Sequence, residues 1–265
     1  MRAKSLRKYG KQPFSVVVVH GGPGAAGEMS PVAKQLAIGH GVLEPLQTGL
    51  TVGEQIEELK EALLKSARLP VTLIGFSWGA WLSFIFAATY PELVKKLILI
   101  GSGGYEEKYG PKTHRTRMAR FSSQEKLEFK SLENLLGNHK TEDKDVIVAK
   151  LGALFTKIDS CNPLPQGKGK AAKVSCSADI FKSVWKDAQE LRASGKLLQL
   201  GRNIRCPVVA IHGDYDPHPA QGVEKPLLRV LKKFRFILLT NCGHKPWIEK
   251  QAKKRFFDIL KEEVV

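Results

Sequence analysis

Residues 71–79 read Val-Thr-Leu-Ile-Gly-Phe-Ser-Trp-Gly, and the residues from Trp78 to Thr89 are apolar almost throughout. The run Val71–Ile74 is typical of a strand buried on both faces, and the Trp78–Thr89 pattern predicts a buried helix. Between them, Gly75–Gly79 forms a G-x-S-x-G turn. In that context a tight turn lifts the serine hydroxyl clear of the backbone, at a helix N-terminus whose dipole favours developing negative charge. This stretch therefore predicts a strand–turn–helix unit with Ser77 as candidate nucleophile; an ordinary strand–helix turn is the alternative.

Further strands and helices alternate on both sides of this unit. The predicted strands are Phe14–Val19, Val94–Ile100, Val208–Ile211, Phe234–Leu239 and, from a weaker pattern, Gly41–Leu46. Thr51 with Glu54 gives a capping-box pattern that opens one helix, and Trp247–Leu260 predicts an amphipathic final helix. Strands that alternate with helices favour an α/β protein with a mostly parallel, doubly wound sheet, here of about six strands.

The alternation stops between about Tyr105 and Arg202. This stretch contains three helical patterns and no convincing buried strand; the patterns are Ser123–Leu136, Asp143–Ile158 and Ala178–Ala193. We therefore expect residues 105–202 to form a helical cap inserted into a core made of residues 1–104 and 203–265.

A serine is a poor nucleophile at neutral pH without a general base. In a strand–serine–helix arrangement the partners follow in the order acid, then histidine. His212-Gly-Asp-Tyr-Asp-Pro217 follows one late strand, and Asn241-Cys-Gly-His244 follows the next. His244 is the candidate base, and Asp216 is the candidate acid that orients the imidazole. Asp214 is the rival acid, better suited to capping a turn through backbone amides.

A loop rich in glycine follows the first long strand and reads His20-Gly-Gly-Pro-Gly24. Such a loop lets backbone amides face a substrate carbonyl oxygen. The candidate oxyanion donors are the amides of Gly22 (or Gly21) and Trp78. A phosphate-binding loop is the alternative, but no G-x-x-x-x-G-K-[ST] motif is present and Pro23 lacks a donor.

The chain resembles the α/β-hydrolase superfamily. Four of its segments match that family's landmarks in the family order: His20–Gly24, Gly75–Gly79, Gly213–Asp216 and Gly243–His244. The resemblance implies a serine hydrolase that cleaves a small ester or amide through an acyl-enzyme. It assigns Ser77 as nucleophile, His244 as base and Asp216 as orienting acid.

The finer class is less defined. His20–Gly24 and the tryptophan after the serine are similar to prolyl aminopeptidases, but Leu43–Gly49 stands where those enzymes carry D-x-R-G-x-G-x-S, and the insertion is basic rather than acidic. A carboxylesterase or amidase is therefore the leading interpretation. A prolyl-aminopeptidase-like peptidase and a non-catalytic ligand-binding protein are the alternatives, and thioesterase, C–C hydrolase and perhydrolase activities stay open because the fold does not choose among them.

The chain carries 42 Lys and Arg against 26 Asp and Glu, a net charge of +16, which raises nucleic acid or anionic surfaces as partners. The excess is spread over both the insertion and the rest of the chain, so we expect a solvated basic surface and neither a specific nucleic-acid nor a membrane partner. No metal-binding motif or cofactor fingerprint is present, and none is expected. The four cysteines form no CxxC pair, and no signal-peptide pattern is present, which favours reduced thiols in the cytoplasm.

Overall fold

A computed structural model describes residues 6–165, 174 and 176–264 of the chain. Its strands form one seven-stranded sheet in the spatial order β1-β3-β2-β4-β5-β6-β7. In chain order the strands are β1 (Leu6–Tyr9), β2 (Phe14–Val19), β3 (Gly41–Pro45), β4 (Val71–Phe76), β5 (Val94–Ile100), β6 (Val208–Gly213) and β7 (Phe234–Leu239). All neighbours pair in parallel except β1, which runs antiparallel to β3. The predicted mostly parallel α/β sheet is confirmed.

The sheet has one strand more than the predicted number of about six. The additional strand, β1, lies at the edge of the sheet and reads Leu-Arg-Lys-Tyr. Two adjacent cations within four residues leave no apolar run to mark it in the sequence. Charged side chains are common on edge strands, because they discourage pairing with another chain.

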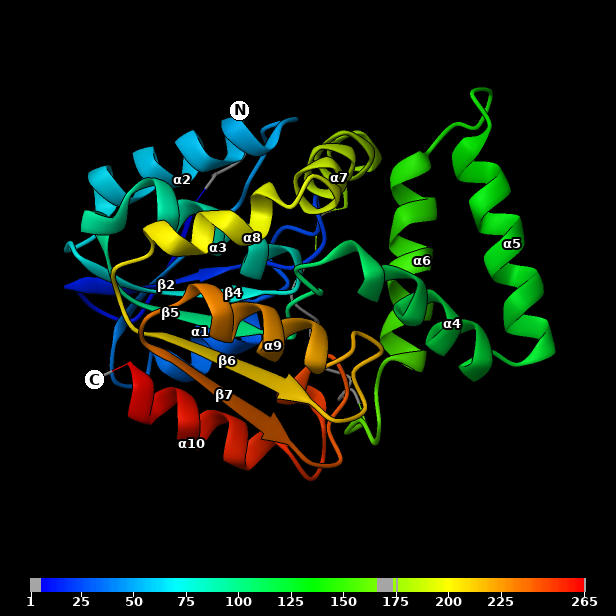
Figure 1. Ribbon diagram of the computed structural model, residues 1–265. Helices are drawn as coiled ribbons and strands as arrows, with labels where there is room; N and C mark the ends of the chain where they lie inside the picture. The colour runs from blue at the N-terminus through cyan, green and yellow to red at the C-terminus, as the bar shows by residue number, and fades with distance from the viewer. Residues whose placement is uncertain (1–5, 166–173, 175, 265) are drawn as a thin grey trace.

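Helices cover both faces of the sheet, which confirms the doubly wound architecture (Figure 1). The α-helices of the described residues are α1 (Ser30–Leu36), α2 (Val52–Ser66), α3 (Trp78–Thr89), α4 (Gly110–Arg120), α5 (Ser123–Gly137), α6 (Lys144–Ile158), α7 (Ala178–Ala193), α8 (Lys196–Leu200), α9 (Gln221–Val230) and α10 (Lys253–Glu263). Short 3-10 turns lie at Pro91–Leu93, Glu107–Tyr109, Gly201–Asn203 and Pro246–Ile248. None of these helices combines the length and the apolar character needed to cross a bilayer.

Two apolar layers hold the sheet between the helices. Successive side chains of a strand point to opposite faces. In β4, Leu73 therefore belongs to the apolar layer that includes side chains of α2, α3 and α9, whereas Ile74 and Phe76 belong to the layer that includes those of α1 and α10. Every residue of β4 and β6 is buried. Double-sided burial explains why the central strands read as uninterrupted apolar runs.

The structure confirms the predicted start of α2 and corrects the predicted start of the final helix. Thr51 and Glu54 form the reciprocal capping box at the start of α2, as predicted. The final helix was predicted to begin at Trp247, and this is wrong: Pro246–Ile248 is a 3-10 turn, and α10 begins only at Lys253. Glu249 lies between the two. Its side chain is fully buried and accepts hydrogen bonds from amides of other loops, and a regular helix through this point would not place its carboxylate there.

The chain between β5 and β6 contains helices and no strand in its described part. Helices α4, α5 and α6 lie beyond the carboxyl ends of the strands (Figure 1), and their apolar side chains form a separate cluster. In contrast, α7 and α8 pack into the same layer as α3. The first part of the inserted stretch therefore forms a separate lobe of α4, α5 and α6, whereas α7 and α8 belong to the core of the sheet domain.

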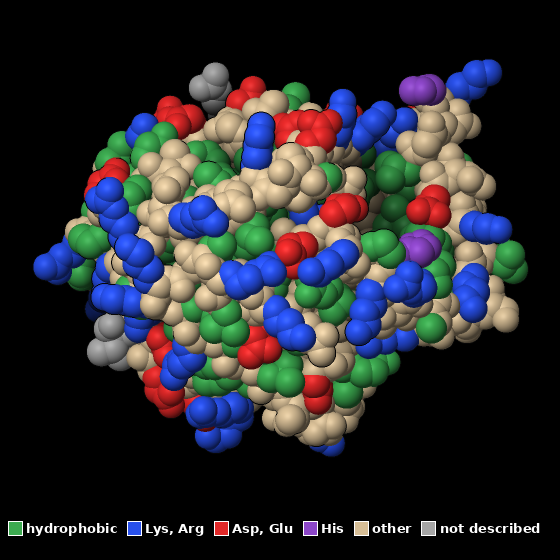
Figure 2. Space-filling view, in the orientation of Figure 1, with side chains coloured by type: hydrophobic (Ala, Val, Ile, Leu, Met, Phe, Trp, Pro, Cys, Tyr) green, Lys and Arg blue, Asp and Glu red, His purple; other side chains and the backbone are tan. Residues whose placement is uncertain are grey.

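The basic side chains are dispersed over the face seen in Figure 2. Lysine and arginine occur over both the sheet domain and the inserted helices, with acidic side chains between them. On this face the positive charge forms a mixed surface rather than one basic stripe.

Candidate active site

Ser77 occupies the turn between β4 and α3. Its backbone has φ 53° and ψ −114°, a left-handed conformation that is unfavourable for a residue with a side chain. The two flanking glycines are required by close backbone contacts. A Cβ on Gly75 would overlap the carbonyl oxygen of Gly79, and one on Gly79 would overlap the carbonyl oxygens of Val19 and His20. The G-x-S-x-G spacing therefore permits a turn that larger residues would block.

The carboxyl ends of β4, β6 and β7 bring three side chains together. Ser77 Oγ lies 3.1 Å from His244 Nε2, and His244 Nδ1 lies 2.7 Å from Asp216 Oδ2. Both His244 and Asp216 are buried, and Ser77 is partly exposed. The result is a continuous hydrogen-bonded chain from a hydroxyl through an imidazole to a carboxylate.

Asp214, the rival acid, is exposed and points elsewhere. Its carboxylate accepts hydrogen bonds from the backbone amides of Asn241, at 3.1 Å, and Cys242, at 3.0 Å. These residues lead directly to His244, so Asp214 holds the loop that carries the imidazole.

The electrostatic surroundings keep Asp216 ionised. Burial of its carboxyl opposes ionisation, but the charges of His244, His212 and His218, together with a hydrogen bond from His218, outweigh burial and hold the pKa of Asp216 well below its ordinary value. An ionised carboxylate at this position is able to stabilise positive charge on the imidazole of His244.

The loop His20–Gly24 leaves β2 next to the serine turn, where the His20 carbonyl oxygen would lie 2.4 Å from a Cβ on Gly79. The imidazole of His20 is fully buried, burial lowers its pKa, and its Nδ1 lies 2.9 Å from the Gly21 carbonyl oxygen. Gly22 has φ +40°, and its carbonyl accepts from Ala25 at 2.9 Å. Trp78 is the first residue of α3, where amides have no partner within the helix. The role of the Gly22 and Trp78 amides as oxyanion donors stays a prediction.

The inserted helices are hydrogen-bonded to both loops of the candidate site. The amide of Ser177, which precedes α7, donates to the Gly24 carbonyl at 3.1 Å. The amide of His244 donates at 2.9 Å to the carbonyl of Asp159, which follows α6. The carboxylate of Asp159 is in turn held by Arg117, with 2.6 Å between Nη2 and Oδ2. The insertion therefore borders the site and fixes part of its backbone.

Glu249 is a residue that sequence reasoning missed. Its side chain is fully buried and accepts three backbone hydrogen bonds: from Cys161 at 2.8 Å, Asn162 at 2.8 Å and Gly243 at 3.0 Å. It joins the end of the insertion to the His244 loop. No motif marks it, because its partners at 161 and 162 are far away in the sequence.

Replacing Glu249 with alanine is expected to lower the free energy of unfolding by roughly 3–9 kcal/mol, because each of three amides loses its acceptor, at about 1–3 kcal/mol each. Urea denaturation measures this loss. The matched control, Glu61→Ala, removes an exposed carboxylate from α2 and is expected to change stability by less than about 0.5 kcal/mol. Equal effects of the two substitutions would contradict the role given to Glu249.

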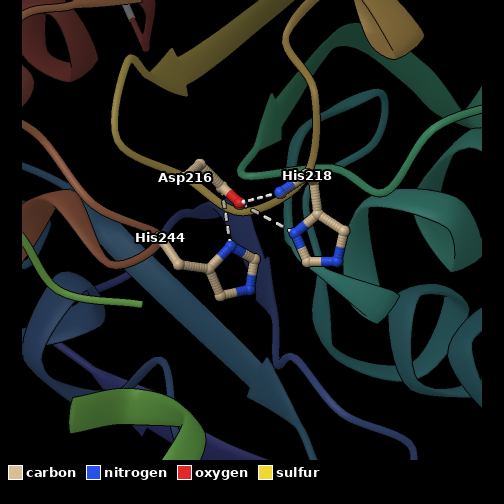
Figure 3. A group of neighbouring side chains, drawn as sticks. All are labelled: Asp216, His218 and His244. Carbon is tan, nitrogen blue, oxygen red and sulfur yellow. Dashed lines mark hydrogen bonds and ion pairs between the residues drawn. The ribbon is translucent and has the colours of Figure 1, made fainter. Parts of the chain in front are cut away.

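Asp216, His218 and His244 also form a cluster in which one ligand atom from each lies within 4.8 Å of the others, a spacing that could hold a metal ion. The contacts favour a different reading. The Nδ1 atoms of both rings lie 2.8 Å and 2.7 Å from the carboxylate oxygens, so these donors and acceptors already satisfy each other (Figure 3). The group is a hydrogen-bond network centred on Asp216.

A doubly wound sheet that carries a strained serine at a strand–helix elbow, with an acid and a histidine at later strand ends, defines the α/β-hydrolase class of fold. The family model described as alpha/beta hydrolase fold matches residues 15–251, and the chain belongs to that family.

Solved structures with this fold cover nearly the whole chain. VinJ is 19% identical with a TM-score of 0.68, over 98% of this chain and 95% of that one. A serine hydrolase involved in carbazole degradation, CarC, is 18% identical with a TM-score of 0.62, over 97% and 92%. A monoacylglycerol lipase of Paleococcus ferrophilus is 16% identical with a TM-score of 0.60, over 97% and 96%. At these identities the likeness shows the fold alone. Among the curated proteins no sequence matches the chain.

Proposed function

We propose that this protein is a serine hydrolase of the carboxylesterase or amidase type, acting on a small ester or amide. The observation that carries the proposal is the hydrogen-bonded chain from Ser77 Oγ through His244 to Asp216. Its geometry meets the distance requirement for a nucleophile, a base and an orienting acid, about 2.6–3.2 Å between heavy atoms. The family membership and the serine hydrolase and lipase among the similar structures support it.

In the proposed reaction the Ser77 oxygen attacks the substrate carbonyl carbon while His244 Nε2 takes the hydroxyl proton. The tetrahedral intermediate collapses, the carbon–oxygen or carbon–nitrogen bond to the leaving group breaks, and His244 returns the proton to that group. A water molecule, deprotonated by His244, then attacks the acyl-enzyme and releases the acid with regeneration of Ser77. Asp216 keeps the imidazole oriented and stabilises its charged form.

The backbone amides of Gly22 and Trp78 are the proposed donors to the oxyanion of each tetrahedral intermediate. Two features support them: the amide at the start of α3 is free of a helical partner, and the loop after β2 is fixed by the Ser177–Gly24 hydrogen bond. Removal of one such donor in comparable enzymes costs about 10²–10³ in kcat. Both donors belong to backbone, so their contribution is set by loop conformation.

Residues 105–202 are proposed to act as the cap that shapes the acyl pocket. Their contacts with the Gly24 and His244 loops support this assignment. We further propose a cytoplasmic location, in keeping with four unpaired cysteines, and a small molecule rather than nucleic acid or membrane as partner, in keeping with the dispersed charge on the face in Figure 2.

A substrate panel tests the proposed function. Purified protein is assayed with p-nitrophenyl esters of increasing acyl length, an anilide and proline naphthylamide. The expected result is saturable turnover of at least one short ester that disappears in Ser77→Ala. Preference for proline naphthylamide would instead favour the prolyl-aminopeptidase-like alternative. Tight binding of the panel compounds without turnover would favour a non-catalytic receptor and contradict the enzyme proposal.

A further inference from the structure

The carboxylate of Asp216 is shared by two imidazoles. Its Oδ2 atom lies 2.7 Å from His244 Nδ1, whereas its Oδ1 atom lies 2.8 Å from His218 Nδ1 and also accepts the backbone amide of His218 at 2.9 Å. Figure 3 shows both rings turned so that Nδ1 faces the carboxylate. The ring centroids of His218 and His244 are 4.9 Å apart. The proposed mechanism uses only one of these two rings.

The chemistry of the contact fixes which atom of His218 carries the proton. An ionised carboxylate accepts hydrogen bonds and donates none, so His218 Nδ1 is the donor and its Nε2 is unprotonated in the neutral ring. Burial lowers the pKa of His218, and the charge of Asp216 only partly offsets that effect. Near neutral pH the contact is therefore a hydrogen bond from a neutral imidazole.

The other charged and titratable groups around His218 lie on different elements. His212, on β6, donates from Nε2 to the His218 carbonyl at 2.8 Å and stays 3.8 Å from the Asp216 carboxylate. The positive charges of His244, after β7, and of Arg117, on α4, act in the direction that lowers the pKa of His218. Among these groups in the described part of the chain, only Asp216 favours a charged His218.

We propose that His218 is a positioning residue for the candidate active site. Its ring N–H donates a hydrogen bond to Asp216 Oδ1 and so fixes the carboxylate with Oδ2 facing His244. The same hydrogen bond limits how strongly the acid stabilises a protonated His244. The proposal rests on the proposed function for its kinetic consequences. The hydrogen-bond coupling itself is a property of the resting protein. The hydrogen bond from His218 to Oδ1 weakens the interaction between the Asp216 carboxylate and His244, because two donors compete for the same negative charge.

Two variants separate the hydrogen bond from the bulk of the ring. His218→Leu removes the N–H donor and replaces the ring with an apolar side chain of similar size. His218→Asn restores an N–H donor near the position of Nδ1 but cannot titrate. The control is His139→Leu, in the exposed connection between α5 and α6. Circular dichroism and urea unfolding establish that each variant is folded before the comparison.

The kinetic readout is the pH dependence of kcat/KM on the best ester of the panel. In His218→Leu we expect kcat to fall roughly tenfold with little change in KM, and the midpoint of the acid limb to move up by about half a pH unit or more, because the unshared Asp216 stabilises the protonated base more strongly. His218→Asn is expected to return kcat to within about threefold of the wild-type value and to return the midpoint toward it. The control should match wild type.

The spectroscopic readout needs no substrate. In proton NMR the wild type is expected to show two downfield imidazole N–H signals, from His244 and His218. His218→Leu should lose one signal and move the His244 signal further downfield, whereas His218→Asn should lose the same signal and leave that of His244 near its wild-type position. Failure of the proposed function would appear as wild type that turns over no substrate, while these signals still report the coupling.

Two results would overturn the proposal. One is an acid limb and a His244 signal that do not move in His218→Leu, even where kcat falls, because the ring would then be merely structural. The other is a His218→Asn variant that behaves like His218→Leu in both readouts, because the hydrogen bond to Asp216 would then not be the cause.

Discussion

Replacement of Ser77 with alanine is expected to lower kcat by about 10⁶-fold, to near the uncatalysed rate plus what binding and oxyanion stabilisation supply. His244 Nε2 is within 3.1 Å of the Ser77 hydroxyl, and without that oxygen no acyl-enzyme forms at this position. The backbone at residue 77 of the wild type has a positive φ, and alanine carries a Cβ as serine does, so we expect the substitution to add no backbone strain. Initial rates with the preferred p-nitrophenyl ester measure the loss.

The control for this experiment is Ser123→Ala, which removes an exposed hydroxyl at the start of α5 and is expected to leave kcat within about twofold of wild type. Urea unfolding of both variants separates loss of chemistry from loss of fold. Retention by Ser77→Ala of more than about one hundredth of the wild-type kcat, in protein free of wild-type contamination, would be incompatible with Ser77 as the nucleophile.

Replacement of Asp216 with asparagine is expected to lower kcat by about 10⁴-fold. An amide carries no charge to stabilise the protonated base, and its N–H group, if it faces His244 Nδ1, imposes the wrong tautomer on the ring. The carboxylate also balances the surrounding imidazoles, since His218 donates to its other oxygen. The pH dependence of the residual rate and the kcat value together measure the effect.

Asp214→Asn provides the matched comparison, because Asp214 is the nearest other acid and is bonded to backbone amides of the His244 loop. We expect it to reduce kcat by about tenfold or less, since an asparagine oxygen still accepts one of the two bonds. A larger loss in Asp214→Asn than in Asp216→Asn would exchange the roles of the two acids.

The segment around the serine could be predicted from sequence because its signals are local. The apolar run of β4, the two close-packed glycines and the apolar helix α3 lie within twenty residues. The capping box of α2 is equally local. The convergence of Ser77, Asp216 and His244 follows from one further rule, that parallel strands place their carboxyl ends at the same edge of the sheet. Their proximity is thus visible in the sequence order, while their chemical roles stay predictions.

The features that sequence reasoning missed depend on distant contacts. Glu249 reads as an ordinary surface glutamate, yet it is buried against amides more than eighty positions away. Helix α7 carries the same kind of amphipathic pattern as α5, yet α7 joins the main core and α5 joins the separate cluster of the insertion. Strand β1 has no apolar run at all. In each case the deciding partner is absent from the local sequence.

The position of His218 is plain in the sequence, but its role is not. The sequence places it two residues after Asp216, but spacing alone does not show whether the ring turns toward the carboxylate or toward solvent. Only the folded loop, with the Asp216 carboxylate accepting both the amide and the ring of His218, shows that the acid has two imidazole partners.

Labelling with a fluorophosphonate probe tests the central claim most directly, because the probe phosphonylates a serine only where a base activates it. Intact-mass spectrometry of the wild type is expected to show a single adduct, and peptide mapping should place it on Ser77. Ser77→Ala should remain unlabelled, and His244→Ala should label far more slowly. A folded wild-type protein that takes up no probe, or a Ser77→Ala variant labelled as fast as wild type, would contradict the assignment of Ser77 as an activated nucleophile.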